Sequence, residues 1–170
     1  TPPSNIYIVS DRVAGGCGGP RSSSSVADST LTEVLLHELG HAVEFHLLNG
    51  KDPAGDRMRA EGWATFFAQI AARSSSVASA SQMEEHQKAL AKQSLQSSPN
   101  GFNFQGSAQD YARAAMYFIT LEQKLGLRAV TQIYEVMQKK SLGFFAAIQE
   151  SVGWDEKRRE KEIRSYLKIS

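Results

Sequence analysis

The sequence predicts a mostly helical fold with one short strand near its amino terminus, an α+β class in which the β part is small. Apolar residues recur with a helical period from about residue 30 to the end of the chain. Asn5–Ser10 is the one segment rich in β-branched and aromatic residues. No period of 20 to 50 residues recurs, which argues against a repeat array. We therefore expect a single domain over residues 1–170.

Residues 1–29 are expected to hold that strand and a flexible loop. The run Gly15–Pro20 contains four glycines, and four serines follow at Ser22–Ser25. Such a composition favours irregular structure. The chain begins with Thr1 and two prolines instead of Met, so we expect it to be a processed or excised piece.

Residues 30–73 are expected to form two helices. The first spans Leu31–Leu48, begins at a capping box of Thr30 and Glu33, and ends at the left-handed pair Asn49-Gly50. The second spans Arg57–Arg73, with Asp56 as its cap and serines after it.

The rest of the chain is expected to be an insertion and a helical tail. The insertion, residues 74–106, contains a polar helix over Gln82–Gln96 with a weak apolar stripe, which favours a surface position. The tail, residues 107–170, is expected to hold four helices, at Gln109–Leu125, Leu127–Lys139, Gly143–Val152 and Trp154–Leu167.

Composition argues against several classes of partner. Lys and Arg number 19 against 18 for Asp and Glu, so we expect no nucleic-acid partner. The run Lys157–Lys161 is interrupted by Glu160, and we interpret it as a solvated helix face. No apolar run approaches the roughly 20 residues of a membrane span, so we expect no membrane insertion. Cys17 is the only cysteine, which excludes an internal disulfide and a thiolate cluster and leaves the compartment open.

Two histidines four residues apart indicate a metal site on the first helix. His37 and His41 lie one turn apart on one face, where both can reach a single Zn²⁺. Glu38 lies about 100° round the helix from His37, so it would flank the ion as a general base. The flanking residues from Val34 to Val43 are otherwise uncharged. A five-residue pattern with two free positions also occurs by chance, so the motif alone leaves a purely structural helix open.

Three residues are candidates for a third ligand. His46 is nine residues after His37 and faces the opposite side of the helix. Glu44 shares the stripe of the two histidines but lies a further turn along, which suits a supporting or structural role. Glu61 lies 20 residues after His41, near the start of the second helix, and a short loop would turn that helix back so that the Glu61 carboxylate projects at the metal. We expect Glu61 to be the third ligand.

His37-Glu-Leu-Gly-His41 followed by Glu61-Gly-Trp-Ala resembles the gluzincin branch of zinc metallopeptidases, the thermolysin-like clan, and most of all its small peptidase-MA-like domains. Tyr111–Phe118, Leu125-Gly126 and Ala147–Gly153 are similar to the helical tail of that group. The likeness covers roughly residues 30–167. It implies a zincin-like helical domain with a reduced N-terminal sheet, one zinc ion per chain, and hydrolysis of a peptide or protein substrate by a metal-activated water. It slightly favours a secreted or periplasmic location.

The chain departs from this family pattern at one supporting position. Thr65 stands where thermolysin-like relatives often carry an aspartate that orients a metal histidine. Tyr111 begins a helix after a Gly/Ser loop, and we expect it to be the oxyanion donor; His86, Tyr117 and Arg113 are the alternatives. The absence of a motif for gripping a free amino terminus favours an endopeptidase.

The substrate is expected to add as a strand at an open sheet edge, beside Ile6–Ser10 or the segment just after it. Two other functions stay open. The first is a zinc-binding pseudopeptidase or regulatory module without turnover, and the intact Glu38 argues against it. The second is a helical interaction module without metal.

Overall fold

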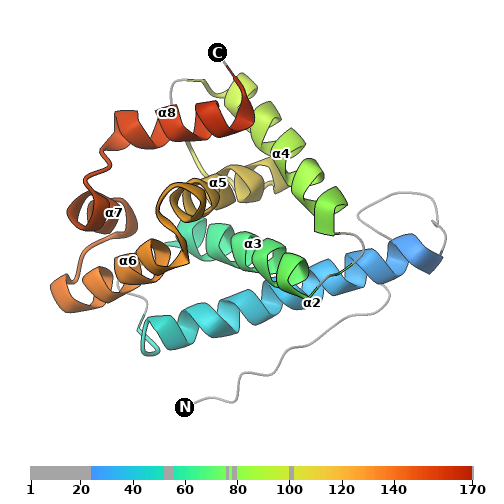
Figure 1. Cartoon of the computed structure of the whole chain (residues 1–170), viewed down its shortest axis with the longest axis horizontal. Coiled ribbons are helices and arrows are strands. Elements are labelled where there is room, and N and C mark those ends of the chain that lie inside the picture. Colours follow the sequence, from blue (N-terminus) through green and yellow to red (C-terminus); the bar gives the residue numbers. More distant parts are fainter. Residues whose placement is uncertain (1–23, 52–55, 76, 78–79, 100–101, 170) are drawn as a thin grey trace.

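The computed structural model describes residues 24–51, 56–75, 77, 80–99 and 102–169. Within them the chain is almost entirely helical and contains no strand, which confirms the mostly helical class (Figure 1). The helices are α2 (Ser24–Leu47), α3 (Arg57–Ser74), α4 (Ala80–Ser97), α5 (Ala108–Leu125), α6 (Leu127–Lys140), α7 (Phe144–Val152) and α8 (Glu156–Leu167). The expected strand Asn5–Ser10 and the glycine-rich loop lie outside the described residues.

Helix α2 begins earlier than its sequence signals predict. It starts at Ser24 and runs through Thr30, so the predicted capping box of Thr30 and Glu33 is wrong. No glycine or proline interrupts residues 24–30, and serine and threonine lower helix propensity only slightly, so the helix continues through them. Its other end follows the prediction, since Asn49 and Gly50 both have positive φ.

Capping side chains fix the starts of the two helices that carry site residues. Asp56 accepts a hydrogen bond from the backbone N–H of Arg59 at the start of α3, as predicted. Ser107 and Asp110 form a reciprocal capping box at the start of α5. This box sets the position of Tyr111 in the first turn.

Helix α3 lies between α2 and α5, and small residues allow both approaches. Figure 1 shows α2 and α3 running antiparallel side by side, with α5 in the middle of the molecule. A Cβ on Gly40 of α2 would lie 2.8 Å from the Cα of Ala64. A Cβ on Gly62 would lie 2.8 Å from the backbone carbon of Ala114 on α5. Neither position therefore has room for a larger residue.

The main core surrounds Trp63 and is largely aromatic. Trp63 and Phe66 are buried and pack with Phe118 at ring-centroid distances of 5.8 Å each. Tyr134 and Phe144 extend this cluster to α6 and α7. None of the helices in the described residues combines the length and apolarity that a membrane crossing requires.

Helix α4 is more deeply packed than a surface helix. Met83, Gln87, Ala91 and Leu95 are buried on its inner face, which packs against α5 and, at Met83, against Ala68 and Ala72 of α3. The sequence interpretation missed this because the buried face mixes polar and apolar residues, which weakens the apolar stripe. The insertion therefore forms one wall of the cleft beside His37, His41 and Glu61.

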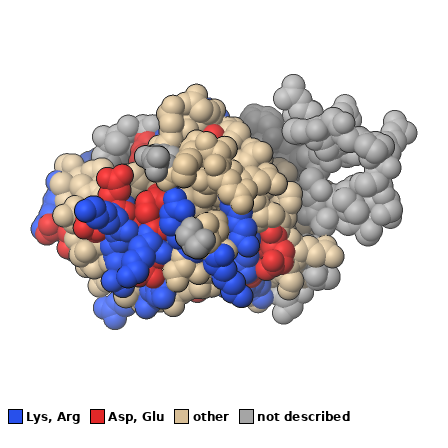
Figure 2. Space-filling view, turned by 90° about the horizontal axis from the view of Figure 1, so that it is seen from above, with Lys and Arg blue, Asp and Glu red and all other residues tan. Residues whose placement is uncertain are grey.

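Basic side chains gather on the face that carries α8. Figure 2 looks at the molecule from above and shows Lys and Arg there with Asp and Glu among them. Glu162 pairs with both Arg158 and Lys124, at 2.7 and 3.4 Å. Lys157, Arg158 and Lys161 are exposed, as a solvated helix face requires. Arg159 departs from this interpretation, because it is buried, donates to the carbonyl of Trp154 and lies over an aromatic ring.

Candidate metal centre

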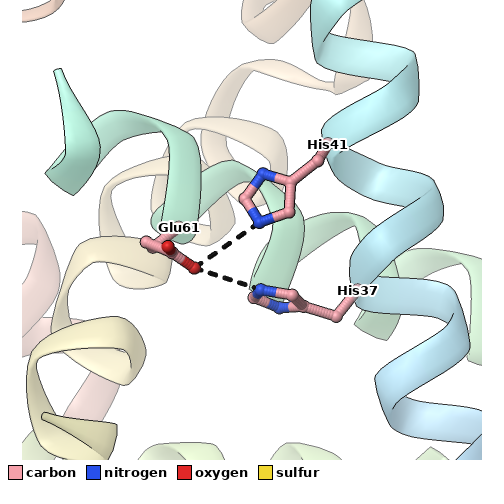
Figure 3. Close-up of side chains that lie close together, drawn as sticks. All are labelled: His37, His41 and Glu61. Atoms are coloured by element: carbon pink, nitrogen blue, oxygen red, sulfur yellow. Dashed lines mark hydrogen bonds and ion pairs between the residues drawn. The ribbon is translucent and has the colours of Figure 1, made fainter. Parts of the chain in front are cut away.

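The structure brings His37, His41 and Glu61 together at the crossing of α2 and α3. Both histidine rings project from α2 toward one carboxylate oxygen of α3 (Figure 3). Glu61 Oε2 lies 3.1 Å from His37 Nε2 and 3.5 Å from His41 Nε2. His37 and His41, which the helical spacing predicts on one face, and Glu61, which is expected as the third ligand, thus form one group.

The spacing of these atoms suits a tetrahedral ion. The three ligand atoms all lie within 4.8 Å of one another. Ligands about 2.0–2.1 Å from zinc at a tetrahedral angle are about 3.3 Å apart, close to both measured separations between His and Glu. The side chains are 16 to 31% exposed, so the group lies at the protein surface in a partly screened position. A small movement of the three side chains would therefore make room for an ion between their donor atoms.

The electrostatics of the group favour a cation. Burial disfavours the charged form of Glu61, but hydrogen bonds and positive charge from His37 and His41 outweigh burial and hold the pKa of this carboxyl well below its usual range. The hydrogen bond with Glu61 raises the pKa of His41 against the effect of burial, and the negative charges of Glu61, Glu38 and Glu44 add to the increase. A carboxylate that stays ionised beside nearby negative charge is suited to holding a divalent ion.

Glu38 follows His37 and lies at the same cleft without joining the group of three. Its side chain is exposed, and it lines the cleft together with His37, His41 and Glu61. This placement agrees with a residue that flanks the ion. Its role as a general base stays a prediction.

A buried ion pair behind the site ties its two helices together. Arg59 Nε donates to Glu44 Oε1 at 2.9 Å, and both side chains are almost completely buried. The hydroxyl of Tyr134 on α6 donates to the same oxygen at 2.6 Å. Burial and the charge of Glu44 raise the pKa of Tyr134 well above its usual value. Glu44 therefore has the structural role that its position predicts. His46 is exposed and is not part of the group of three.

Tyr111 lies at the site, in a stack of rings. Its ring stacks on His37 at 6.2 Å and on Phe104 at 5.7 Å. Its hydroxyl accepts a hydrogen bond from Arg57 Nη2 at 3.2 Å. Arg57 also reaches Glu61 Oε1, with its Nε at 3.7 Å. Whether Tyr111 is an oxyanion donor stays a prediction.

Of the three alternatives to Tyr111 as oxyanion donor, only His86 lines the cleft. Tyr117 is buried in the core, and its hydroxyl donates to Glu160. Arg113 is buried and bonds to the carbonyl of Ser98 and to Glu160. His86 is exposed on α4 and lines the cleft, on a different helix from the candidate ligands of α2 and α3.

The group opens into a cleft of about 630 Å³ bounded by four helices. Helix α2 contributes the histidines, and α3 contributes Glu61, Thr65 and Gln69 at four-residue intervals. Met83 and Gln87 of α4 form the opposite wall. The volume falls in the range of about 300–1,000 Å³ typical of ligand sites.

Sequence reasoning missed Arg57, Gln69 and Gln87. Arg57 precedes Glu61 by four residues on a helix, and this spacing alone indicates that the two side chains are neighbours. The two glutamines carry no such signal. They belong to the cleft only because α4 packs beside α3, which no local pattern reveals.

No family model matches the chain, and no curated protein or solved structure matches it either. The zincin-like fold therefore stays a prediction. The function has to be inferred from the site itself.

Proposed function

We propose that this chain is a zinc-dependent metallopeptidase. The observation that supports the proposal best is one cleft that holds the donor atoms of His37, His41 and Glu61 within 4.8 Å of one another and exposes Glu38 beside them. The resemblance of the two sequence motifs to gluzincins points to the same activity.

The donor set fits zinc. Two imidazole nitrogens and one carboxylate oxygen leave one coordination position open, which is typical of catalytic zinc sites and unlike closed structural ones. Zinc held there would activate water near neutral pH and polarise a carbonyl group. The remaining steps depend on side chains of this chain.

We assign the handling of protons and charge to Glu38 and Tyr111. Glu38, exposed at the cleft, would accept a proton from water and return it to the leaving nitrogen of a peptide. The Tyr111 hydroxyl accepts from Arg57, so its own proton is free to be donated to a developing oxyanion. Arg57 would hold that hydroxyl in position.

The experiment compares zinc content and hydrolysis in the wild type and in Glu38→Gln. We expect about one zinc per chain in both proteins, and cleavage of an unfolded protein substrate by the wild type alone. A zinc-binding module without turnover would bind the ion and leave the substrate intact. A metal-free interaction module would bind no zinc. Either result would overturn the proposal, and so would loss of zinc from Glu38→Gln, because that residue would then be a ligand.

A further inference from the structure

Two glutamine side chains in the cleft carry polar atoms without a partner. Gln69 of α3 and Gln87 of α4 are both more than nine-tenths buried and line the cleft. Gln69 Nε2 and Gln87 Oε1 have no hydrogen-bond partner. Among the described residues only three buried side-chain atoms lack a partner, and the third, Arg113 Nε, lines no part of this cleft. Since a buried polar group without a partner costs about 1–3 kcal/mol, two such groups in one cleft need an explanation.

The orientation of Gln87 is set by its neighbour on α2. Its Nε2 donates to Glu33 Oε1 at 3.2 Å. An ionised carboxylate can only accept, so the amide nitrogen must face Glu33 and the carbonyl oxygen must be the free atom. Gln69 therefore keeps a free donor and Gln87 a free acceptor beside the cleft. Each atom has less than 1 Å² of accessible surface, so a ligand would reach it after the side chain turns toward the cleft.

A neutral amide is the group that matches both free atoms. Its carbonyl accepts from Gln69 and its N–H donates to Gln87. A carboxylate would satisfy Gln69 alone and would lie near the negative charge of Glu33. An ammonium would satisfy Gln87 alone, and an apolar group would satisfy neither. Met83 and Leu90, which also line the cleft, provide apolar surface for a side-chain stem.

The subsite lies beyond the candidate metal centre along α3. Glu61, Thr65 and Gln69 follow one another at four-residue intervals and all line the cleft. Eight residues of helix span about 12 Å. An extended peptide advances about 3.3 Å per residue, so this span corresponds to roughly three to four residues of substrate.

We propose that Gln69 and Gln87 form a recognition subsite for an amide group of a peptide, three to four residues from the bond held at the metal centre. The amide is either the side-chain carboxamide of glutamine or asparagine or a backbone amide. The subsite itself stands on the two free atoms, and only its distance from the hydrolysed bond rests on the proposed function.

The two free atoms predict that stability and peptide binding change in opposite directions when either glutamine is replaced. A glutamine that only supports the fold would not give this result. In the free protein the two atoms lower stability because they are buried without partners. Methionine has a similar length and no polar group to satisfy. Gln69→Met should therefore keep or raise the melting temperature while it weakens peptide binding.

The test uses the Glu38→Gln protein, in which peptides are not cleaved, with and without chelator. The probes are blocked heptapeptides of alanine and serine in which one glutamine is moved along the sequence. Matched peptides carry glutamate, lysine or methionine in its place. Dissociation constants are measured by calorimetry, and the side-chain amide signals of Gln69 and Gln87 by NMR.

We expect one register of glutamine to bind at least about tenfold tighter than its matched peptides and to shift both amide signals. Gln69→Met and Gln87→Met should remove the preference. Gln96→Met, an exposed change on the same helix as Gln87, should keep it. If the bound group is a backbone amide, every peptide will bind alike, and the two cleft variants will weaken all of them equally.

The subsite is overturned if Gln69→Met and Gln87→Met bind all peptides as the parent protein does, or if they lose thermal stability without any change in binding. A glutamine preference in a protein that never binds zinc would leave the subsite standing and remove the metallopeptidase proposal. If the wild type hydrolyses peptides with zinc and neither cleft variant changes peptide binding, the metallopeptidase proposal stands and the subsite is rejected.

Discussion

The indole Nε1–H of Trp63 donates a 2.9 Å hydrogen bond to the backbone carbonyl of Gly40. This bond joins the two sequence segments that supply the candidate ligands, because Gly40 directly precedes His41 and Trp63 follows Glu61 by two residues. Trp63 is buried, and Gly40 touches the backbone of α3. Direct contact of two helix backbones therefore sets the separation between the histidines and the carboxylate.

Gly40→Ala should destabilise the protein and weaken its affinity for zinc. The added Cβ would lie 2.8 Å from the Cα of Ala64, so α2 and α3 must move apart. Overpacking of this kind costs about 1–3 kcal/mol. Urea unfolding with chelator would measure the free energy of unfolding, and zinc titration the affinity.

Gly143→Ala is the matched control, because its Cβ meets nothing within 4 Å. It should unfold close to the wild type and bind zinc equally well. Equal behaviour of both variants would show that close contact at Gly40 does not set the metal geometry.

Zinc should raise the melting temperature of the wild type, and a chelator should lower it. A ligand at 100 times its dissociation constant stabilises the folded state by about 2.7 kcal/mol. For a chain of this size that corresponds to an increase of roughly 5–10 °C. Thermal unfolding of the wild type and of His37→Ala, each with zinc and with chelator, would measure the effect. An equal shift in His37→Ala would place the zinc elsewhere.

The candidate ligand group was predictable from sequence because each part has a local signal. The spacing of His37 and His41 places both rings on one face of a helix. Glu61 lies near the start of the next helix, and a short connection makes the two helices antiparallel neighbours. Asn49-Gly50 marks the end of the first of them, and the structure has positive φ at both residues.

Other features depend on contacts that no local pattern encodes. Thr30 has the sequence of a helix cap, yet the helix runs through it because the preceding residues also support helix. Gln69 and Gln87 are ordinary polar residues until α4 packs beside α3 and buries them. Arg159 belongs to a charged run and is buried by contacts with α7 and the residues before α8.

Tyr111→Phe should lower kcat and leave zinc affinity unchanged. The hydroxyl lies outside the group of three, so its loss removes only a donor to the developing charge. Loss of one such donor lowers kcat by about 10²–10³ in a serine protease. Arg57→Met should produce a smaller loss, because Arg57 acts by positioning the hydroxyl. Peptide hydrolysis with separate kcat and KM values would test both. A rise in KM alone would indicate that Tyr111 only binds substrate.

Glu61→Gln and Glu44→Gln should separate metal binding from stability. Glu61 is placed with both histidines, and its loss should weaken zinc binding by more than the 10–100-fold typical of an outer partner. Its burial is partial, so the protein should stay folded.

Glu44→Gln should have the opposite profile. The change removes the charge of the carboxylate that pairs with Arg59 on α3, and breaking a buried ion pair costs about 3–5 kcal/mol. Tyr134 can still donate to the amide oxygen of glutamine, so the local packing of α6 should remain. Zinc affinity, measured at low temperature where circular dichroism shows the variant to be folded, should stay near that of the wild type. His46→Ala, at an exposed position of the same helix, should change neither property. Should Glu44→Gln or His46→Ala abolish zinc binding while Glu61→Gln retains it, the third ligand is not Glu61 and the gluzincin-type assignment fails.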